Sequence, residues 1–210
     1  SIGHVLDLVG VDAATADALK RAVLAAPAAA ALGLAAPAHV MLCCTHTHTG
    51  PQTHGGFIGM GHADSAYMAF LTRQVVAAFV QSAQSLVACT LRHLRTHALE
   101  GVSVNRRQRV VAPSAPTSAS SSSSAASSSS AVRWFEKAGR TSLGQRSEGP
   151  RKHRADVLRL ESAAGTLATV VAFACHPTCV GPLLEQSGDY PAALRRRVEA
   201  HTSAPALYLN

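Results

Sequence analysis

The sequence predicts an α/β fold: a mixed, partly parallel sheet flanked by helices, with a candidate site at the carboxyl ends of its strands. Short, nearly unbroken apolar runs alternate along the chain with longer segments in which apolar residues recur every three or four positions. The first pattern is typical of buried strands and the second of amphipathic helices, and their alternation indicates an α/β domain. Two of the strand-like runs lead directly into histidines, and open α/β sheets bind ligands at the carboxyl ends of their strands.

The first 44 residues predict a strand, a helix and a second strand. Residues 5–9 form a short apolar run between two glycines, and Asp12 is a suitable N-cap for the helix that follows. One face of that helix carries apolar residues at the required spacing: Ala16, Leu19, Val23 and Ala26. Residues 39–44 are almost entirely apolar, which favours a buried strand.

The rest of the chain continues the alternation. Residues 64–86 have the spacing of an amphipathic helix. Strands are expected at 89–100, 102–104, 156–162 and 167–175. A helix is expected at 189–201, with Pro191 in its first turn, where proline is tolerated, and a last strand at 206–210.

A low-complexity insert interrupts the predicted domain at about 113–154. Ten of the thirteen residues from 118 to 130 are serine, and 133–154 is basic and contains glycines. Such a segment has too little apolar surface to form a core, so we predict a disordered loop. Residues 1–210 are therefore interpreted as one domain with an insertion, and as a fragment, because both ends resemble the interior of a domain.

Composition excludes some classes of function. The formal net charge is +7, but aromatic residues make up only 4% of the chain, so we expect no nucleic-acid partner. Five cysteines without a Cys-x-x-Cys pair do not predict a disulfide framework. No apolar run reaches about 18 residues, so no membrane span is predicted.

The histidines at the strand ends are the candidate site. In an extended segment His46 and His48 would point to the same side, and His176 follows a second strand. A catalytic zinc takes about three protein ligands plus water, so His46 and His176 are candidate ligands and His48 a supporting residue or general acid/base. Hydrogen bonds from these histidines to the backbone are the alternative. His54 and His62 lie in a glycine-rich loop and are expected to be exposed.

Four ordered motifs resemble the neutral/alkaline, non-lysosomal ceramidases, which are zinc-dependent amidases that cleave the N-acyl bond of ceramide. The motifs are "LDLVGVD" (6–12), "THTHTGP" (45–51), "VNRR" (104–107) and "FACHPT" (173–178) continued by "SGDYPAALRR" (187–196). The resemblance is to the N-terminal catalytic domain, and it is closer to the broad bacterial and algal branch than to the animal enzymes.

The resemblance implies roles for individual residues. His46 and His176 are implied as zinc ligands, and His48 as a residue lining the active site. Arg106 is implied as the contact to the substrate head group; without the resemblance it would be one member of a solvated basic run. Asp189 is either the N-cap of the last helix or a polar group near the site.

The resemblance also implies Zn²⁺ as cofactor, a ceramide-like lipid amide as substrate, peripheral contact with a membrane, and a secreted or membrane-associated location. It places the nucleophilic serine and two more zinc ligands, a Glu and a Tyr, in segments that follow the strand at 206–210, so these 210 residues alone are expected to be inactive. Two other classes stay open: a different metallohydrolase, such as the barrel amidohydrolases, and an inactive truncated domain that binds lipid or protein through its basic insert.

Overall fold

The computed structural model of the chain describes residues 1–54, 61–96, 101–103, 105, 107–109, 141–143, 152–180 and 185–210. The chain divides into two compact units, one formed by Ser1–Glu100 with Lys152–Asn210 and the other by Gly101–Arg151. All of the candidate histidines belong to the first unit.

Helices and strands alternate through the first unit, as predicted. Its helices are α1 (Ala13–Leu24), α2 (Pro27–Ala31), the 3-10 helix η1 (Pro37–His39), α3 (Ser65–Gln84) and α4 (Asp189–Thr202). Its strands are β1 (Ile2–Leu6), β2 (Val40–Cys44), β3 (Thr90–Thr96), β6 (Ala155–Ser162), β7 (Gly165–Ala172) and β8 (Ala206–Leu209).

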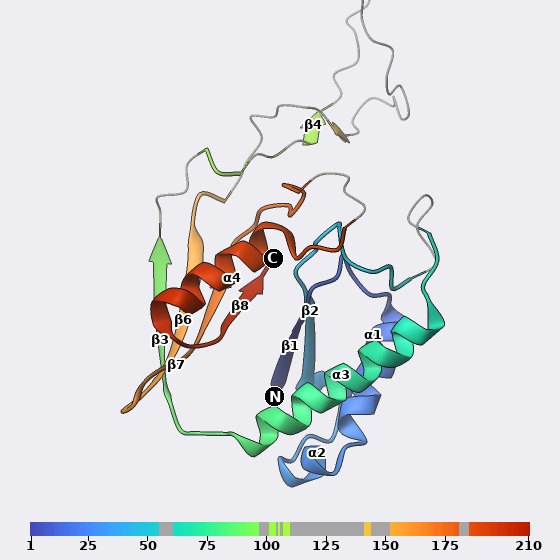
Figure 1. Ribbon diagram of the computed structural model, residues 1–210, viewed down its shortest axis with the longest axis vertical. Helices are drawn as coiled ribbons and strands as arrows, with labels where there is room; N and C mark the ends of the chain where they lie inside the picture. The colour runs from blue at the N-terminus through green and yellow to red at the C-terminus, as the bar shows by residue number, and fades with distance from the viewer. Residues whose placement is uncertain are drawn as a thin grey trace, which may run out of the picture. The chain divides into compact units, whose positions relative to one another are not determined.

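The strands of the first unit form two sheets with both parallel and antiparallel pairs. β1 pairs with β2 in parallel, with Ile2 opposite Val40. The other sheet has the order β3-β6-β7-β8, in which only the β7–β8 pair is parallel. β8 also contacts β1, so the two sheets lie side by side (Figure 1). The predicted mixed, partly parallel α/β architecture is confirmed.

Helix caps fix where the two long N-terminal helices begin. The Asp12 carboxylate accepts the Thr15 N–H at 2.7 Å, and the Asp64 carboxylate accepts the Tyr67 N–H at 2.7 Å. Each bond satisfies one of the backbone donors that the first turn leaves unpaired. The predicted cap at Asp12 is confirmed.

Two apolar clusters hold the helices against the sheets. In the first, α1 and α3 pack on β1 and β2 through Leu19, Val23 and Phe79, all at most 1% exposed. In the second, α4 lies over the four-stranded sheet (Figure 1). Tyr208 and Phe173 are buried there against residues of α4. These clusters fix the strand ends from which the candidate site is built.

The second unit contributes one strand pair to the description. β4 (Arg107–Arg109) pairs antiparallel with β5 (Thr141–Leu143). β5 lies within the range 113–154 that was predicted to be disordered; nearly all of that range lies outside the described residues, so its disorder remains a prediction.

Within the described residues, three predicted strands differ from the structure by two residues or more. The strand expected at 167–175 is β7 (Gly165–Ala172), so residues 173–175 lie beyond the strand and lead from it to His176. The first strand covers Ile2–Leu6 rather than 5–9, because the parallel partner β2 begins opposite Ile2. The strand expected at 102–104 was wrong at Val102 and Ser103: Val102 lies in a turn beside Gly101, whose φ is +77°, and Ser103 lies in no strand. Val104 lies outside the described residues.

Two further observations concern the cysteines and the helices. All five cysteines are free thiols. Among the helices of the described part of the chain, none combines the length and the apolarity needed to cross a membrane.

Candidate metal centre

His46 lies just beyond the end of β2, where hydrogen bonding to the first strand continues. The Thr45 N–H donates to the Leu6 carbonyl at 2.9 Å, and the His46 N–H donates to the Leu8 carbonyl at 3.0 Å. His46 has a φ of +67°, in the left-handed region that residues other than glycine seldom adopt. Such outliers are held in place by their surroundings and often occur at functional sites.

Three imidazole rings meet at this edge of the sheets. The ring centroid of His46 lies 5.0 Å from that of His48 and 5.1 Å from that of His176, and the centroids of His48 and His176 are 4.6 Å apart. One potential ligand atom from each ring lies within 4.8 Å of the others, so the three side chains could hold a metal ion. The sequence predicted that His46 and His48 share a side through strand alternation. They do meet, but through a left-handed turn at His46 rather than an extended backbone.

The backbone sets the tautomer of His46. Its Nδ1 lies 2.6 Å from the Val9 carbonyl oxygen, which can only accept a hydrogen bond. Nδ1 therefore carries the proton, and Nε2 keeps its lone pair for a ligand. An imidazole N–H bonded to a carbonyl is the usual support of a metal-binding histidine.

His48 and His176 are in direct contact. Their Nε2 atoms are 2.8 Å apart, a distance at which one ring donates a hydrogen bond to the other. Imidazole nitrogens are suitable zinc ligands, and the three rings offer such atoms within 4.8 Å of one another. The histidines therefore fit a zinc ion in chemistry and position.

Buried threonines hold the loop that carries His46 and His48. Thr47 is 0% exposed, and its hydroxyl donates to the Ser187 carbonyl at 2.7 Å. The Thr49 hydroxyl donates to the same carbonyl at 2.8 Å, and the Ser187 N–H returns a bond to the Thr49 carbonyl at 3.0 Å. The loop after β2 is thereby fixed to the segment that precedes α4.

The glycine of the same motif allows a close approach of two chain segments. A Cβ at Gly50 would lie 2.9 Å from the Asp7 carbonyl oxygen and 3.6 Å from the Leu8 Cα. A side chain at this position would push the loop away from the segment that follows β1.

The prediction for His54 was wrong. The side chain is buried, with 7% exposure. Thr53 beside it is 1% exposed and donates to the Gly10 carbonyl at 2.5 Å, so this end of the loop packs inward rather than into solvent. His62 is exposed, as predicted.

Asp189 is not a simple N-cap. The N-cap position of α4 is Gly188, and Asp189 is the first helical residue, with a φ of +51° and 5% exposure. Its carboxylate accepts the Val180 N–H at 3.0 Å and the Tyr190 N–H at 2.6 Å. Burial acts to raise the pKa of Asp189, but these backbone N–H groups outweigh it and the pKa lies below its usual value. The cap interpretation is therefore wrong, and the carboxylate instead joins the loop after β7 to the first turn of α4.

Two tyrosines that the sequence analysis missed hold the strand leading to His176. The Tyr190 hydroxyl donates to the Cys175 carbonyl at 2.7 Å, and the Tyr208 hydroxyl donates to the Phe173 carbonyl at 2.5 Å. The two hydroxyls also contact each other. Burial raises the pKa of Tyr208 to about 12, so it stays a neutral donor. The sequence signal was the position of Tyr190 in "SGDYP", directly after Asp189.

Arg106, the residue implied to contact the substrate head group, lies outside the described residues. Its assignment remains a prediction.

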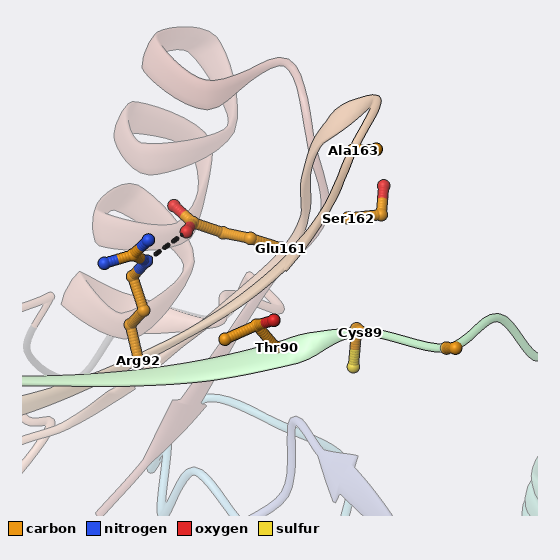
Figure 2. A pocket seen from close by; sticks show the side chains of 7 residues that line it. Cys89, Thr90, Arg92, Glu161, Ser162 and Ala163 are labelled. Carbon is orange, nitrogen blue, oxygen red and sulfur yellow. Dashed lines mark hydrogen bonds and ion pairs between the residues drawn. The ribbon is translucent and has the colours of Figure 1, made fainter.

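The structure also has a pocket of about 450 Å³ that none of the candidate histidines lines; Figure 2 shows the residues of its wall. It forms where β3 begins and the β6–β7 turn lies, at the end of β7 opposite to His176. Its wall includes an ion pair in which the Arg92 Nε donates to Glu161 at 2.5 Å. The pocket is open and its charged groups are already paired, so it does not extend the histidine site.

Comparison with solved structures identifies the architecture. The chain superimposes on neutral ceramidase from Pseudomonas aeruginosa with a TM-score of 0.62, over 98% of its own length. The chain has a neutral ceramidase-like fold. Sequence identity is 16%, and the chain spans 29% of the length of that enzyme. No protein-family model and no curated protein sequence matches the chain.

The suspected resemblance is thus confirmed at the level of the fold. Within that fold, His46 and His176 come from the ends of two different strands and meet His48 at one point. Neutral imidazole nitrogens are good ligands for borderline metals such as zinc, so the cluster has a chemistry that suits a metal ion.

Proposed function

We propose that the chain is the metal-binding part of a zinc-dependent amidohydrolase that cleaves the N-acyl bond of ceramide or a related lipid amide. The observation that carries the proposal is the meeting of His46, His48 and His176 at the strand ends of a ceramidase-like fold. The motifs "THTHTGP" and "FACHPT", which place these histidines, support the substrate class.

His46 and His176 are the proposed ligands. His46 offers Nε2, because its Nδ1 proton is bonded to the Val9 carbonyl, and His176 offers the Nε2 that now contacts His48. When bound, zinc would act as a Lewis acid that polarises the acyl carbonyl and stabilises the negative charge of the tetrahedral transition state.

His48 is the proposed proton carrier. Once the Nε2 of His176 is engaged as a ligand, the Nε2 of His48 loses that partner and can accept or donate a proton. His48 is the exposed member of the three histidines, so it is open to a substrate. Hydrolysis breaks the C–N bond, adds water across it and leaves a fatty acid and a free amine, which takes up a proton.

Arg106 is proposed to bind the acyl carbonyl or the product carboxylate, because a guanidinium can donate two parallel hydrogen bonds to a carboxylate. The nucleophilic serine and the two remaining ligands are proposed to come from segments of a longer protein. The 210 residues alone are therefore expected to bind zinc weakly and to hydrolyse nothing.

The test is fatty-acid release from ceramide in detergent micelles. The full-length protein that contains these residues should release fatty acid, lose that activity on chelation and recover it with zinc. His46→Ala should abolish hydrolysis, whereas His62→Ala, which changes an exposed histidine, should not. Release that survives both chelation and His46→Ala would contradict the proposal. Hydrolysis by the 210 residues alone, if it depended on His46, would contradict the separate claim that these residues form an incomplete site.

The alternative of a barrel amidohydrolase is disfavoured by the topology. The described strands form open sheets that mix parallel and antiparallel pairs, whereas such barrels are closed and parallel. Binding of lipid or protein through the basic insert remains a prediction, since nearly all of that segment lies outside the described residues.

A further inference from the structure

One short segment contacts both of the loops that carry the histidines. The segment Ser187–Tyr190, hereafter the bridging segment, joins the loop after β2 through the Ser187 carbonyl, which accepts the hydroxyls of Thr47 and Thr49. These two threonines flank His48 in the sequence. The position of His48 is therefore tied to the bridging segment.

The other half of the bridging segment holds the loop after β7. One carboxylate oxygen of Asp189 accepts the N–H of Val180, four residues after His176, and the Tyr190 hydroxyl donates to the carbonyl of Cys175, directly before His176. The loop between these points is itself folded, since the Thr178 N–H donates to the His176 carbonyl at 3.0 Å. The position of His176 is thus tied to the same segment.

The bridging segment is packed too closely to adjust freely. A Cβ at Gly188 would lie 2.7 Å from the Ala192 Cβ and 3.6 Å from a carboxylate oxygen of Asp7. That oxygen also accepts a bond from Arg195 of α4 at 2.5 Å. Asp189 keeps a left-handed backbone in this position, a conformation that is unfavourable in a residue other than glycine. Its carboxylate bonds compensate for this cost.

We propose that Asp189 is a positioning residue for the metal centre: its carboxylate, together with the Ser187 carbonyl, sets the position of His176 relative to the loop that carries His46 and His48. The inference rests on the proposed function, because it assigns the role through the metal that the histidines hold. Asp189 need not touch the metal or the substrate. It holds the backbone on either side of a ligand, as outer partners of metal sites do.

The substitution Asp189→Asn isolates the carboxylate. Asparagine has the same shape and tolerates the left-handed conformation, so the backbone can stay in place. The two carboxylate oxygens each accept a backbone N–H, whereas an asparagine has one acceptor oxygen and would point its NH₂ group at the other donor. Asp17→Asn, in an exposed ion pair with Arg21, is the matched control.

The readout is zinc affinity of the 210-residue chain, measured by competition with a chromophoric chelator, together with the visible spectrum of bound Co²⁺ and the apo-protein Tm. We expect Asp189→Asn to lower the zinc affinity by roughly 10-fold to 100-fold, the range found for residues that hydrogen-bond to metal ligands, and to change the spectrum of bound Co²⁺. Asp17→Asn should change neither. A lowered Tm with unchanged zinc affinity and spectrum would show a merely structural role and overturn the inference.

A second pair of variants keeps the test decisive if Asp189→Asn does not fold. Thr47→Val removes the hydroxyl that donates a hydrogen bond to the Ser187 carbonyl, and Thr47→Ser retains that hydroxyl. Weaker zinc binding in the valine variant, rescued in the serine variant, supports the inference; equal affinities overturn it.

Wild-type chain that binds no zinc would overturn the proposed function and this inference together. Zinc binding that depends on Asp189, in a full-length protein that hydrolyses no lipid amide, would overturn the proposed function alone.

Discussion

Replacing His176 with alanine should reduce zinc affinity by more than about 100-fold, because losing a ligand costs more than losing an outer partner. His176 is a proposed ligand that follows β7 in the chain, and its Nε2 lies 2.8 Å from that of His48. With this ring removed, His46 and His48 remain as neighbours on one loop, without the ligand from the second sheet. Isothermal titration of the 210-residue chain with zinc measures the change.

The matched control for this prediction is His62→Ala, because His62 is an exposed histidine outside the cluster. It should bind zinc as the wild type does. His48→Ala should lower the zinc affinity less than His176→Ala does, since His48 is assigned to proton transfer rather than to metal binding. Equal losses in all three variants would point to non-specific binding and contradict the assignment.

Replacing Phe79 with alanine should lower the free energy of unfolding by about 3–5 kcal/mol, the usual cost of removing a buried phenylalanine. Phe79 is 0% exposed and lies on the face of α3 that packs into the cluster with α1, β1 and β2. The substitution would leave a cavity beneath the strands that present His46. Urea denaturation followed by circular dichroism gives the free energy.

Phe70→Ala on the same helix is the matched control, because Phe70 is 47% exposed. Its cost should stay within about 0.5 kcal/mol, as for most surface substitutions. A similar loss for both phenylalanines would mean that α3 does not bury the face described here.

The architecture was largely predictable because local signals agreed with the packing. Asp12 precedes an apolar helical repeat, and the structure places the cap and the buried Leu19 and Val23 as that pattern indicates. The run before Cys44 is apolar without alternation, and it forms β2. The contribution of two different strand ends to one site followed from the general placement of ligands in α/β sheets.

The details of the site were not predictable, because they depend on contacts between residues far apart in the sequence. The left-handed turn at His46 follows from its bond to Leu8, and the burial of His54 accompanies the bond of Thr53 to Gly10. The role of Asp189 depends on Val180, nine positions earlier, across a loop that helix-cap rules do not consider. Cap preferences describe only the local turn, so they favoured the wrong partner.

The most direct test of the metal centre is to locate zinc in crystals of the chain by anomalous scattering at the zinc absorption edge. We predict one zinc bound by the Nε2 atoms of His46 and His176, with His48 beside it. Zinc bound elsewhere, for example at the adjacent thiols of Cys43 and Cys44, with no zinc at the three histidines, would contradict the account.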